Sequence, residues 1–548
     1  MTAAANDSSL SPSPQKASAA VSDAPDASWA AAAAAAECAS CSSTSHGGLS
    51  SSRLSNDDGI SVETKRERWS SQQSEEEVYE NPHGKMGWFM TGLFVVGELA
   101  GGGIVALPMA MIQTGLVPGL PLLLVTTAVM AFTACLLGRA WCMLLSAWPV
   151  YREHTRKPFA EIGYRACGPI VRAIVSFNIN VTQFGVGVVF LLLSSRNIQN
   201  LLRSFFQLDI KYCWLIVAVA IFILPFTMLK SPGDFWWAIL LAMFTTVIAV
   251  VLIVAGSLMD YGTCHPASEM PPFRASNFFL GFGTLVFSLG GHTAFPTIQH
   301  DMKRPADFTK STAVAYSATT VLYAVTCIVT IEAYGDAIRD SVVSSIQSVV
   351  IQDIINVLIT AHLVLAFTIV FNPLNQALEQ TVRAPQNFCW QRVVVRSSLM
   401  AVAVFVAASV PTFGPLLNLV GSSIVSVSVV CFPCVFYLAL TARQRLREQG
   451  GDDDRPATIR EIFDNNSTMM LALCGLVILF GLLGGAAGTY SAIRDISGAH
   501  FEPPCYLSLG HHDGSNHTAS TNCCGKWQNI TTRAGVECSP PDLNFYIK

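Results

Sequence analysis

The chain has 548 residues, of which 51% are hydrophobic and only 13% are charged, whereas soluble domains carry about 25% charged residues. The formal net charge is −4 and no basic domain is present, which excludes nucleic acid as a partner. This composition excludes an ordinary cytosolic enzyme and a disordered scaffold. It indicates a protein that crosses a membrane several times.

Residues 1–85 differ in composition from the rest of the chain. They contain long Ser, Ala, Asp and Glu stretches, including SLSPSPQ and the run Ala30–Ala36. Such segments cannot bury enough apolar surface to offset the entropy of ordering, so we expect a disordered cytoplasmic tail.

Apolar segments follow one another between residues 86 and 490. Eleven of them are long enough to cross about 30 Å of hydrocarbon as helices. They cover residues 87–113, 118–139, 169–195, 212–229, 234–257, 276–298, 312–333, 351–376, 393–409, 413–440 and 468–490. We therefore expect an all-α polytopic membrane protein with one transmembrane domain over residues 86–490.

Basic residues in the short connections predict the orientation, because cytoplasmic loops carry an excess of Lys and Arg. The connections on the amino-terminal side hold Arg152, Arg156, Lys157, Arg165, Lys230, Lys303, Arg304, Lys310, Arg383, Arg392, Arg443, Arg445, Arg447, Arg455 and Arg460. The opposite connections hold Arg196, Arg203, Lys211, Arg274 and Arg339. This bias predicts a cytoplasmic amino terminus, and an odd number of crossings then predicts an extracellular or lumenal carboxyl terminus.

The polar tail over residues 491–548 carries two features that fit an oxidising, glycosylating compartment. Two N-glycosylation sequons begin at Asn516 and Asn529. Four cysteines allow two disulfides in three possible pairings, namely Cys505, Cys523, Cys524 and Cys538. Plasma membrane and endolysosomal or vesicular membrane satisfy these features equally, so the membrane is left open.

Two further cysteines lie at predicted outer ends of neighbouring connections. Cys213 lies at the start of the fourth crossing and Cys264 follows the fifth. A disulfide between them is our hypothesis from this placement.

The first and sixth crossings contain matching interruptions. Gly102-Gly103 is followed by Pro108 in the first, and Gly290-Gly291 by Pro296 in the sixth, so both read GGxxAΦP, where Φ is a large apolar residue. Glycine is a poor helix former and proline lacks a backbone donor, so both helices are expected to unwind near the bilayer centre. Because five crossings separate the two motifs, the second copy must insert upside down, as in transporters built from inverted repeats. Close packing of small residues between continuous helices is the alternative interpretation.

A broken helix offers two kinds of end to a ligand. The amino end of its second half presents N–H groups and a positive dipole to a carboxylate, and the carboxyl end of its first half presents carbonyl groups to an ammonium or a cation. A zwitterionic amino acid needs both ends a few ångströms apart. This match favours amino acids over sugars or inorganic ions.

Three stretches, GGGIVALPMA, FSLGGHTAFPTIQHDMKRP and YREHTRKPFAEIGYRACGP, resemble the amino acid/auxin permease family over about residues 85–490. The resemblance implies a secondary amino acid transporter with a LeuT-like five-plus-five inverted repeat, broken first and sixth helices, and an eleventh helix. It also implies that the substrate contacts residues on both breaks, namely Gly101, Gly102, Gly103, Ile104, Ser288, Gly290, Gly291 and His292.

The coupling ion is less clearly indicated by the sequence. Sodium-coupled members typically place Asn where this chain has Gly97. Glu98 lies in the middle of an apolar crossing, where an ionised carboxylate costs about 2.5–3.5 kcal/mol on insertion scales. We interpret Glu98 as the carrier of a coupling proton or as the partner of the substrate ammonium. A protonated Glu98 that donates one hydrogen bond to a neighbouring helix is the alternative, and sodium coupling stays open.

Two histidines lie inside predicted crossings, His292 in the sixth and His362 in the eighth. His292 is expected to sense pH or donate to the substrate, with a satisfied structural histidine as the alternative. His362 is expected to form hydrogen bonds in the bundle interior.

Other function classes find less support. No filter loop or ring of like charges indicates a channel, eleven crossings exceed a seven-helix receptor, and no HExxH, GxSxG or nucleotide loop indicates an enzyme. The sequence therefore predicts a transporter of amino acids, with a small neutral substrate favoured. We expect no cofactor and no metal, with the lipid bilayer and the amino acid as partners; the oligomeric state is not indicated.

Overall fold

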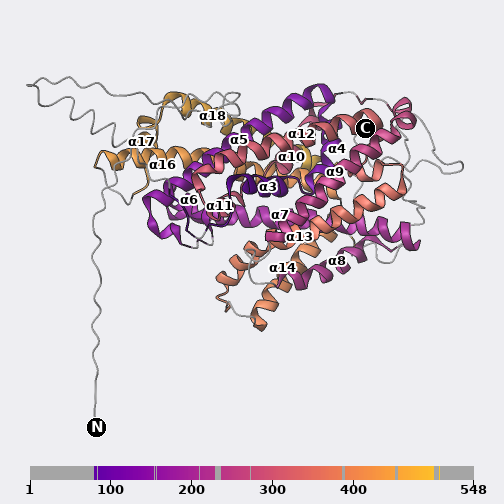
Figure 1. Cartoon of the computed structure of the whole chain (residues 1–548), viewed down its shortest axis with the longest axis horizontal. Helices are drawn as coiled ribbons and strands as arrows, with labels where there is room; N and C mark the ends of the chain where they lie inside the picture. The colour runs from indigo at the N-terminus through magenta and orange to yellow at the C-terminus, as the bar shows by residue number, and fades with distance from the viewer. Residues whose placement is uncertain are drawn as a thin grey trace, which may run out of the picture.

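The computed structural model describes residues 79–498 except 83, 154, 156, 209, 229–235, 269, 272, 386–388, 411 and 451–454, together with residue 505. This part of the chain is helical (Figure 1), and its β structure is limited to an isolated parallel bridge between Met86 and Met302. The predicted all-α class is confirmed.

The helices form two halves of the bundle, followed by α17 and α18. The first half comprises α3 (Trp88–Leu99), α4 (Gly103–Thr114), α5 (Leu116–Ala147), α6 (Pro158–Cys167), α7 (Pro169–Phe206), α8 (Tyr212–Thr227) and α9 (Trp236–Cys264). The second half comprises α10 (Ala275–Ser288), α11 (Phe295–His300), α12 (Phe308–Tyr334), α13 (Val349–Thr381), α14 (Trp390–Ser409), α15 (Phe413–Val420) and α16 (Phe432–Glu448). Two π-helical segments, Gly421–Val425 and Val427–Cys431, join α15 to α16, and the short α17 (Ile459–Asp464) precedes α18 (Thr468–Gly498).

The predicted crossings coincide with these helices. Eight described helical segments are long and apolar enough to span a membrane, and α3 with α4 forms a ninth span that bends by 61°. The shorter apolar helices α8 and α10 stand at the places of the fourth and sixth predicted crossings.

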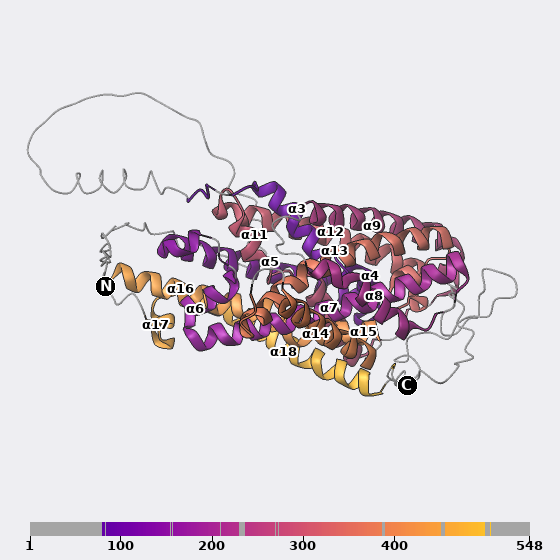
Figure 2. The same cartoon turned by 90° about the horizontal axis from the view of Figure 1, so that it is seen from below.

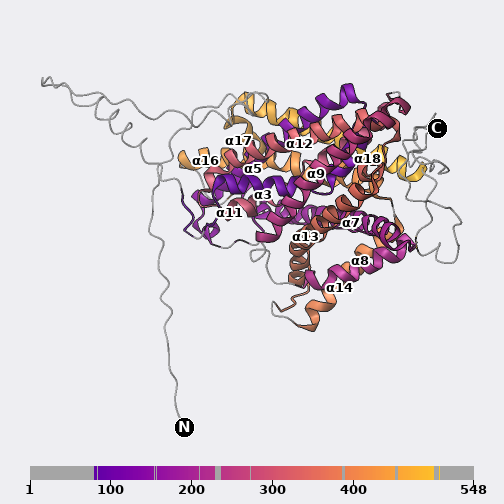
Figure 3. The same cartoon turned by 45° about the vertical axis from the view of Figure 1, so that its right-hand side comes forward.

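The helix contacts repeat between the two halves. Helices α7, α8 and α9 of the first half correspond to α13, α14 and α15 of the second. Accordingly, α7 packs on α8 and α13 packs on α14, while α13 packs on α9 and α7 packs on α15. Helix α12 packs on α9 as α5 packs on α16, while α8 and α14 pack on each other along one edge of the bundle (Figures 1 and 3). A five-plus-five inverted repeat requires this correspondence of contacts, so the inverted repeat predicted from the two motifs and the LeuT-like architecture implied by the family resemblance are confirmed.

Helix α18 lies outside this repeat. Only 22% of its apolar window is buried, against 67% for the span that contains α15 and α16. It packs on α10, on α15 and on the π-helical segments, and it forms an outer edge of the molecule in Figure 2.

Short helices and basic residues gather at one end of the bundle. Helices α6, α11 and α17 lie there in both Figure 1 and Figure 2. The guanidinium groups of Arg165, Arg443 and Arg447 lie 4.5–4.9 Å from the ring of Trp148, and Arg443 donates to the carbonyl of Arg165. The connections that follow the second and the tenth crossing are therefore in contact. The excess of Lys and Arg predicts that both lie on the cytoplasmic side.

A short strap precedes the first helix. Asn81 donates to the carbonyl of His300 at 2.7 Å, and Lys303 donates to the carbonyl of Met86 at 2.9 Å. Glu80 pairs with Arg304. These contacts attach the chain ahead of α3 to the end of α11, so the boundary predicted at residue 85 falls within a segment that packs on the helical domain.

The structure corrects the expected disulfide pairing. Cys213, at the start of α8, is bonded to Cys505 beyond α18, and the amide of Cys505 donates to the carbonyl of Ala408 at 2.9 Å. The expected bond between Cys213 and Cys264 is therefore wrong, and Cys505 does not pair within the carboxyl-terminal tail. Three connections predicted to share one face meet at this disulfide.

Replacing Cys213 by serine should leave Cys505 as a thiol that an alkylating reagent modifies, because its bonded partner is gone. Peptide mapping under non-reducing conditions should recover a linked pair of peptides containing Cys213 and Cys505 from the parent protein only. Recovery of a Cys213–Cys264 peptide pair would contradict this pairing.

Candidate functional site

The first helix break lies between Leu99 and Gly103. The amide of Ala100 completes the last turn of α3 on the carbonyl of Val96, and the amide of Gly101 bonds to the carbonyl of Leu99 at 2.9 Å. Pro108, inside α4, has no N–H to continue the ladder back to Ile104. The interruption predicted from the glycines and the proline is thus present.

The second break lies between Ser288 and Phe295. The amide of Gly290 bonds to the carbonyl of Phe287, and that of Ala294 bonds to the carbonyl of Gly291, both over three residues, as in a β-turn, rather than over four, as in an α-helix. Pro296 stands in the first turn of α11, where its missing donor costs nothing. Both predicted interruptions are therefore confirmed.

The two breaks touch each other. A Cβ atom placed on Gly103 would lie 2.9 Å from Cα of Ser288 and closer still to its side chain. A Cβ atom on Gly291 would lie 3.1 Å from Cγ of Glu98 and 3.2 Å from Cδ2 of Leu99. The structure thus brings Gly103 next to Ser288, and Gly291 next to Glu98; all four are candidate site residues.

Other predicted residues face different neighbours. Cβ positions on Gly101 and Gly102 point toward α7 and α13, with Phe190 within 3.8 Å of both and Leu363 3.2 Å from the second. Gly290 approaches the carbonyl of Val286 and the π-helical segment at Val425. Ile104 is fully buried.

Glu98 is a carboxylic acid with no polar partner among the described residues. Its side chain is half-buried on α3, and no hydrogen bond or ion pair joins it to the described residues. A carboxyl group in this situation is available to a proton or to an ammonium.

The ring of His292 is turned away from the first break. It is fully buried, and its Nε2 lies 2.9 Å from Oγ1 of Thr133 and 3.1 Å from the carbonyl of Met130, both on α5. The imidazole therefore links the second break to α5. Its Nδ1 is buried without a hydrogen-bond partner among the described residues, so the satisfied structural histidine is met at Nε2 alone, and contact of His292 with the substrate stays a prediction.

His362 lies closer to the first break than the sequence indicated. Its Nδ1 lies 3.0 Å from the carbonyl of Ala242 and 2.8 Å from Oγ1 of Thr246 on α9, in agreement with the expected hydrogen bonding inside the bundle. Its Nε2 lies 3.2 Å from the Cβ position of Gly101. Since a neutral ring that donates from Nδ1 accepts at Nε2, this nitrogen presents a lone pair to the unwound turn.

Two tyrosines on α12 were missed by the sequence reasoning. The hydroxyl of Tyr323 lies 2.7 Å from the carbonyl of Leu99 and 3.0 Å from the carbonyl of Ser288. The hydroxyl of Tyr316 lies 3.0 Å from the carbonyl of Leu289. Their seven-residue spacing, which puts both on one helix face, was the available signal.

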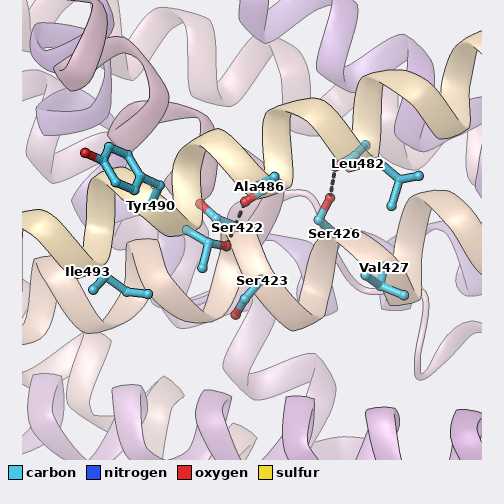
Figure 4. A pocket seen from close by; sticks show the side chains of 11 residues that line it. Ser422, Ser423, Ser426, Val427, Leu482, Ala486, Tyr490 and Ile493 are labelled. Atoms are coloured by element: carbon cyan, nitrogen blue, oxygen red, sulfur yellow. Dashed lines mark hydrogen bonds between the residues drawn. The ribbon is translucent and has the colours of Figure 1, made fainter.

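A crevice of about 450 Å³ lies away from these breaks, between α18 and the π-helical segments (Figure 4). Ser422, Ser423 and Ser426 line one wall, with Ala486 and Tyr490 on the other. The hydroxyl of Ser426 donates to the carbonyl of Gly481.

Several predicted features lie outside the described residues, namely Asn516, Asn529, Cys523, Cys524 and Cys538. Within the described part, no three His, Cys, Asp or Glu side chains are grouped so as to hold a metal ion.

Comparison with known proteins identifies a family for most of the chain. Residues 84–450 match the family model described as "Transmembrane amino acid transporter protein". Amino acid transporter AVT1J of Arabidopsis thaliana is 24% identical over 427 residues, which cover 76% of this chain and 93% of that relative. Amino acid transporter AVT3A of the same plant is 22% identical over 419 residues, covering 73% and 87%.

Solved structures of two transporters are also similar. A manganese transporter of Eremococcus coleocola aligns with a TM-score of 0.46 at 12% identity, covering 78% of this chain and 92% of that one. The nucleobase-cation-symport-1 family transporter Mhp1, in a closed conformation, aligns with a TM-score of 0.46 at 11% identity, covering 76% and 92%.

Proposed function

The chain belongs to the transmembrane amino acid transporter family, and from this premise we propose that it is a secondary active transporter that carries a small neutral amino acid. It is an integral membrane protein, and the relatives it matches are named transporters rather than enzymes. The observation that carries the proposal is the contact between two broken helices at Gly103 and Ser288.

The broken ends suit the two charges of an amino acid. Leu99 and Ser288 end α3 and α10, so their carbonyls stand at the negative ends of two half-helices. Helix α4 begins at Gly103 with Gly102 as its N-cap, so its first N–H groups have no partner within the helix. We assign the substrate ammonium to the carbonyls and the carboxylate to these N–H groups.

A neutral side chain suits the surroundings of the breaks. Phe190, Leu193 and Leu363 lie against the Cβ positions of Gly101 and Gly102, and all three are apolar and buried. A charged substrate side chain would lose its hydration there without gaining an ionic partner.

In transporters built from inverted repeats, alternating access is rocking or gating of one bundle of helices against the other around the binding site. The strap that joins Met86 to Met302 couples the start of α3 to the end of α11. We propose that these two half-helices, at the end that carries α6 and α17, open together toward the cytoplasm.

The same end is assigned to the cytoplasm. Arg165, Arg443 and Arg447 cluster around Trp148 there, as expected for the side that retains positive charge. The bond between Cys213 and Cys505 then lies on the extracellular or lumenal side, where disulfides persist. Plasma and endolysosomal or vesicular membranes both fit this placement.

We propose protons as the coupling ion. Glu98 has no polar partner in the described structure and lies against Gly291, so proton uptake there would alter contacts at both breaks. Gly97 offers no side-chain oxygen to sodium. Sodium coupling is the alternative, and the test must distinguish it from proton coupling.

Reconstitution into liposomes tests the transport proposal. Saturable accumulation of radiolabelled neutral L-amino acids, driven by an inward proton gradient, is the expected result. A non-saturating ion current without accumulation would instead indicate a channel.

Replacing Glu98 by glutamine should remove the response to the proton gradient, because the amide cannot bind the coupling proton. We expect gradient-driven accumulation to fall to the level of downhill exchange, while counterflow of labelled substrate persists. Uptake by the variant that still follows the gradient would rule out Glu98 as the proton carrier. His292→Gln is the comparison variant, since its ring faces α5 and should not abolish the gradient response.

A further inference from the structure

One hydroxyl group joins the two half-helix ends. The carbonyls of Leu99 and Ser288, here called the carbonyl pair, both lie within hydrogen-bond distance of Tyr323 Oη, at 2.7 and 3.0 Å. Each carbonyl terminates a half-helix whose dipole places partial negative charge there. Two such ends facing each other at membrane depth repel unless something positive lies between them.

Tyr323 is held in this position by its helix. Its side chain is fully buried, and Tyr316, on the same face of α12, donates in the same way to Leu289 at the second break. Helix α12 packs closely along α3, and it also contacts α4. The phenol therefore reaches the carbonyl pair from a helix outside both breaks.

A phenol hydroxyl carries one proton, which limits what it can satisfy. At any moment its proton is directed to one member of the carbonyl pair, and the other member still has lone pairs to offer. A metal cation between the same oxygens would occupy both. The Leu99 carbonyl also accepts from the amide of Gly101 at 2.9 Å, so the lone pairs left for a ligand are chiefly those of Ser288.

We propose that the Tyr323 hydroxyl takes the place of a metal cation between the two half-helix ends, so that the carbonyl pair accepts a substrate ammonium without sodium. This inference rests on the proposed function and adds to it a positioning residue that determines ion dependence. Its consequence is specific: without the hydroxyl, the carbonyl pair becomes a site for a small monovalent cation.

The test compares Tyr323→Phe with the parent protein in liposomes filled and bathed with chloride salts of sodium, potassium or N-methyl-D-glucamine. The parent should transport the best-accepted neutral amino acid with the same KM in all three media. The variant should show a KM raised about tenfold in N-methyl-D-glucamine, because the hydrogen bond that bridges the two carbonyls is lost. Sodium should restore much of that loss in the variant.

Tyr334→Phe is the matched control. Tyr334 is also fully buried on α12, but its hydroxyl donates to Asp260 Oδ2 at 2.6 Å, away from the breaks. This control should lose stability to a similar degree and show no sodium response.

Three results would overturn the inference. They are a parent protein whose uptake sodium stimulates, a Tyr323→Phe variant with the parent's KM in every medium, and an equal sodium response in both phenylalanine variants. If Tyr323→Phe does not fold, the parent's ion dependence decides alone. Absence of saturable amino acid uptake in the parent would instead refute the proposed function.

Discussion

Replacing Gly103 by valine is expected to abolish amino acid uptake. A Cβ atom at this position would lie 2.9 Å from Cα of Ser288, and backbone atoms cannot move aside as a flexible side chain can. The two half-helices must separate to admit it, at a cost of about 1–3 kcal/mol for an overpacked contact. If this free energy destabilises the state that binds substrate, the affinity for the amino acid falls by about 5- to 150-fold.

Gly475→Val supplies the matched control, because nothing lies within 4 Å of a Cβ atom at that exposed position on α18. Binding is measured as substrate-induced thermal stabilisation of the purified protein, and transport as uptake into liposomes. Gly103→Ala should already show a reduced affinity, since alanine brings the same Cβ atom. Parent-like uptake by Gly103→Val would mean that the contact between the breaks does not matter for binding.

The second large effect is expected at a buried ionic cluster that joins α13 to α14. Oε1 of Glu379 lies 2.5 Å from Nε of Arg396 and 3.1 Å from Nε of Arg392, and all three side chains are at most 9% exposed. Arg396 also donates to the carbonyl of Thr227, the last residue of α8. One carboxylate thus holds two guanidinium groups at the point where three helices end or begin.

Glu379→Gln should leave two buried positive charges without their counter-ion. Removing one partner of a buried pair costs about 3–5 kcal/mol, so the apparent melting temperature should fall by about 5–10 °C. The temperature at which the detergent-solubilised protein loses its monodisperse peak is the readout. Asp464→Asn, which removes an exposed partner of Arg460, should shift it by less than about 2 °C. Equal shifts in the two variants would show that the cluster does not stabilise the fold.

The helix breaks could be predicted from sequence because their cause is local. Consecutive glycines and a proline remove helix propensity and a backbone donor wherever they occur, so Gly102-Gly103 and Gly290-Gly291 located both interruptions. The inverted repeat then followed from the number of crossings between them.

Side-chain direction on an unwound turn was not predictable in the same way. Helical periodicity fixes where a side chain points only while the helix continues. His292 lies within the second break, so its ring could have faced either the first break or α5, and the structure places it against Thr133. Tyr323 was overlooked because its seven-residue spacing from Tyr316 places both on one face of α12 but does not indicate which helices that face meets.

The disulfide pairing depended on the tertiary fold in the same sense. Cys213 and Cys264 end neighbouring connections, but proximity in sequence does not place their sulfur atoms together. Residues 213 and 505 meet because the start of α8, the end of α14 and Cys505 lie at one face.

Recognition of a zwitterion by the two broken helices is the central claim, and competition by matched analogues tests it most directly. Uptake of the preferred neutral amino acid into liposomes is measured against an excess of its amine analogue, its carboxylic acid analogue and the unlabelled amino acid itself. The account predicts that only the compound with both charges competes strongly, since each helix end binds one of them. Equal competition by an analogue that lacks either charge would contradict it.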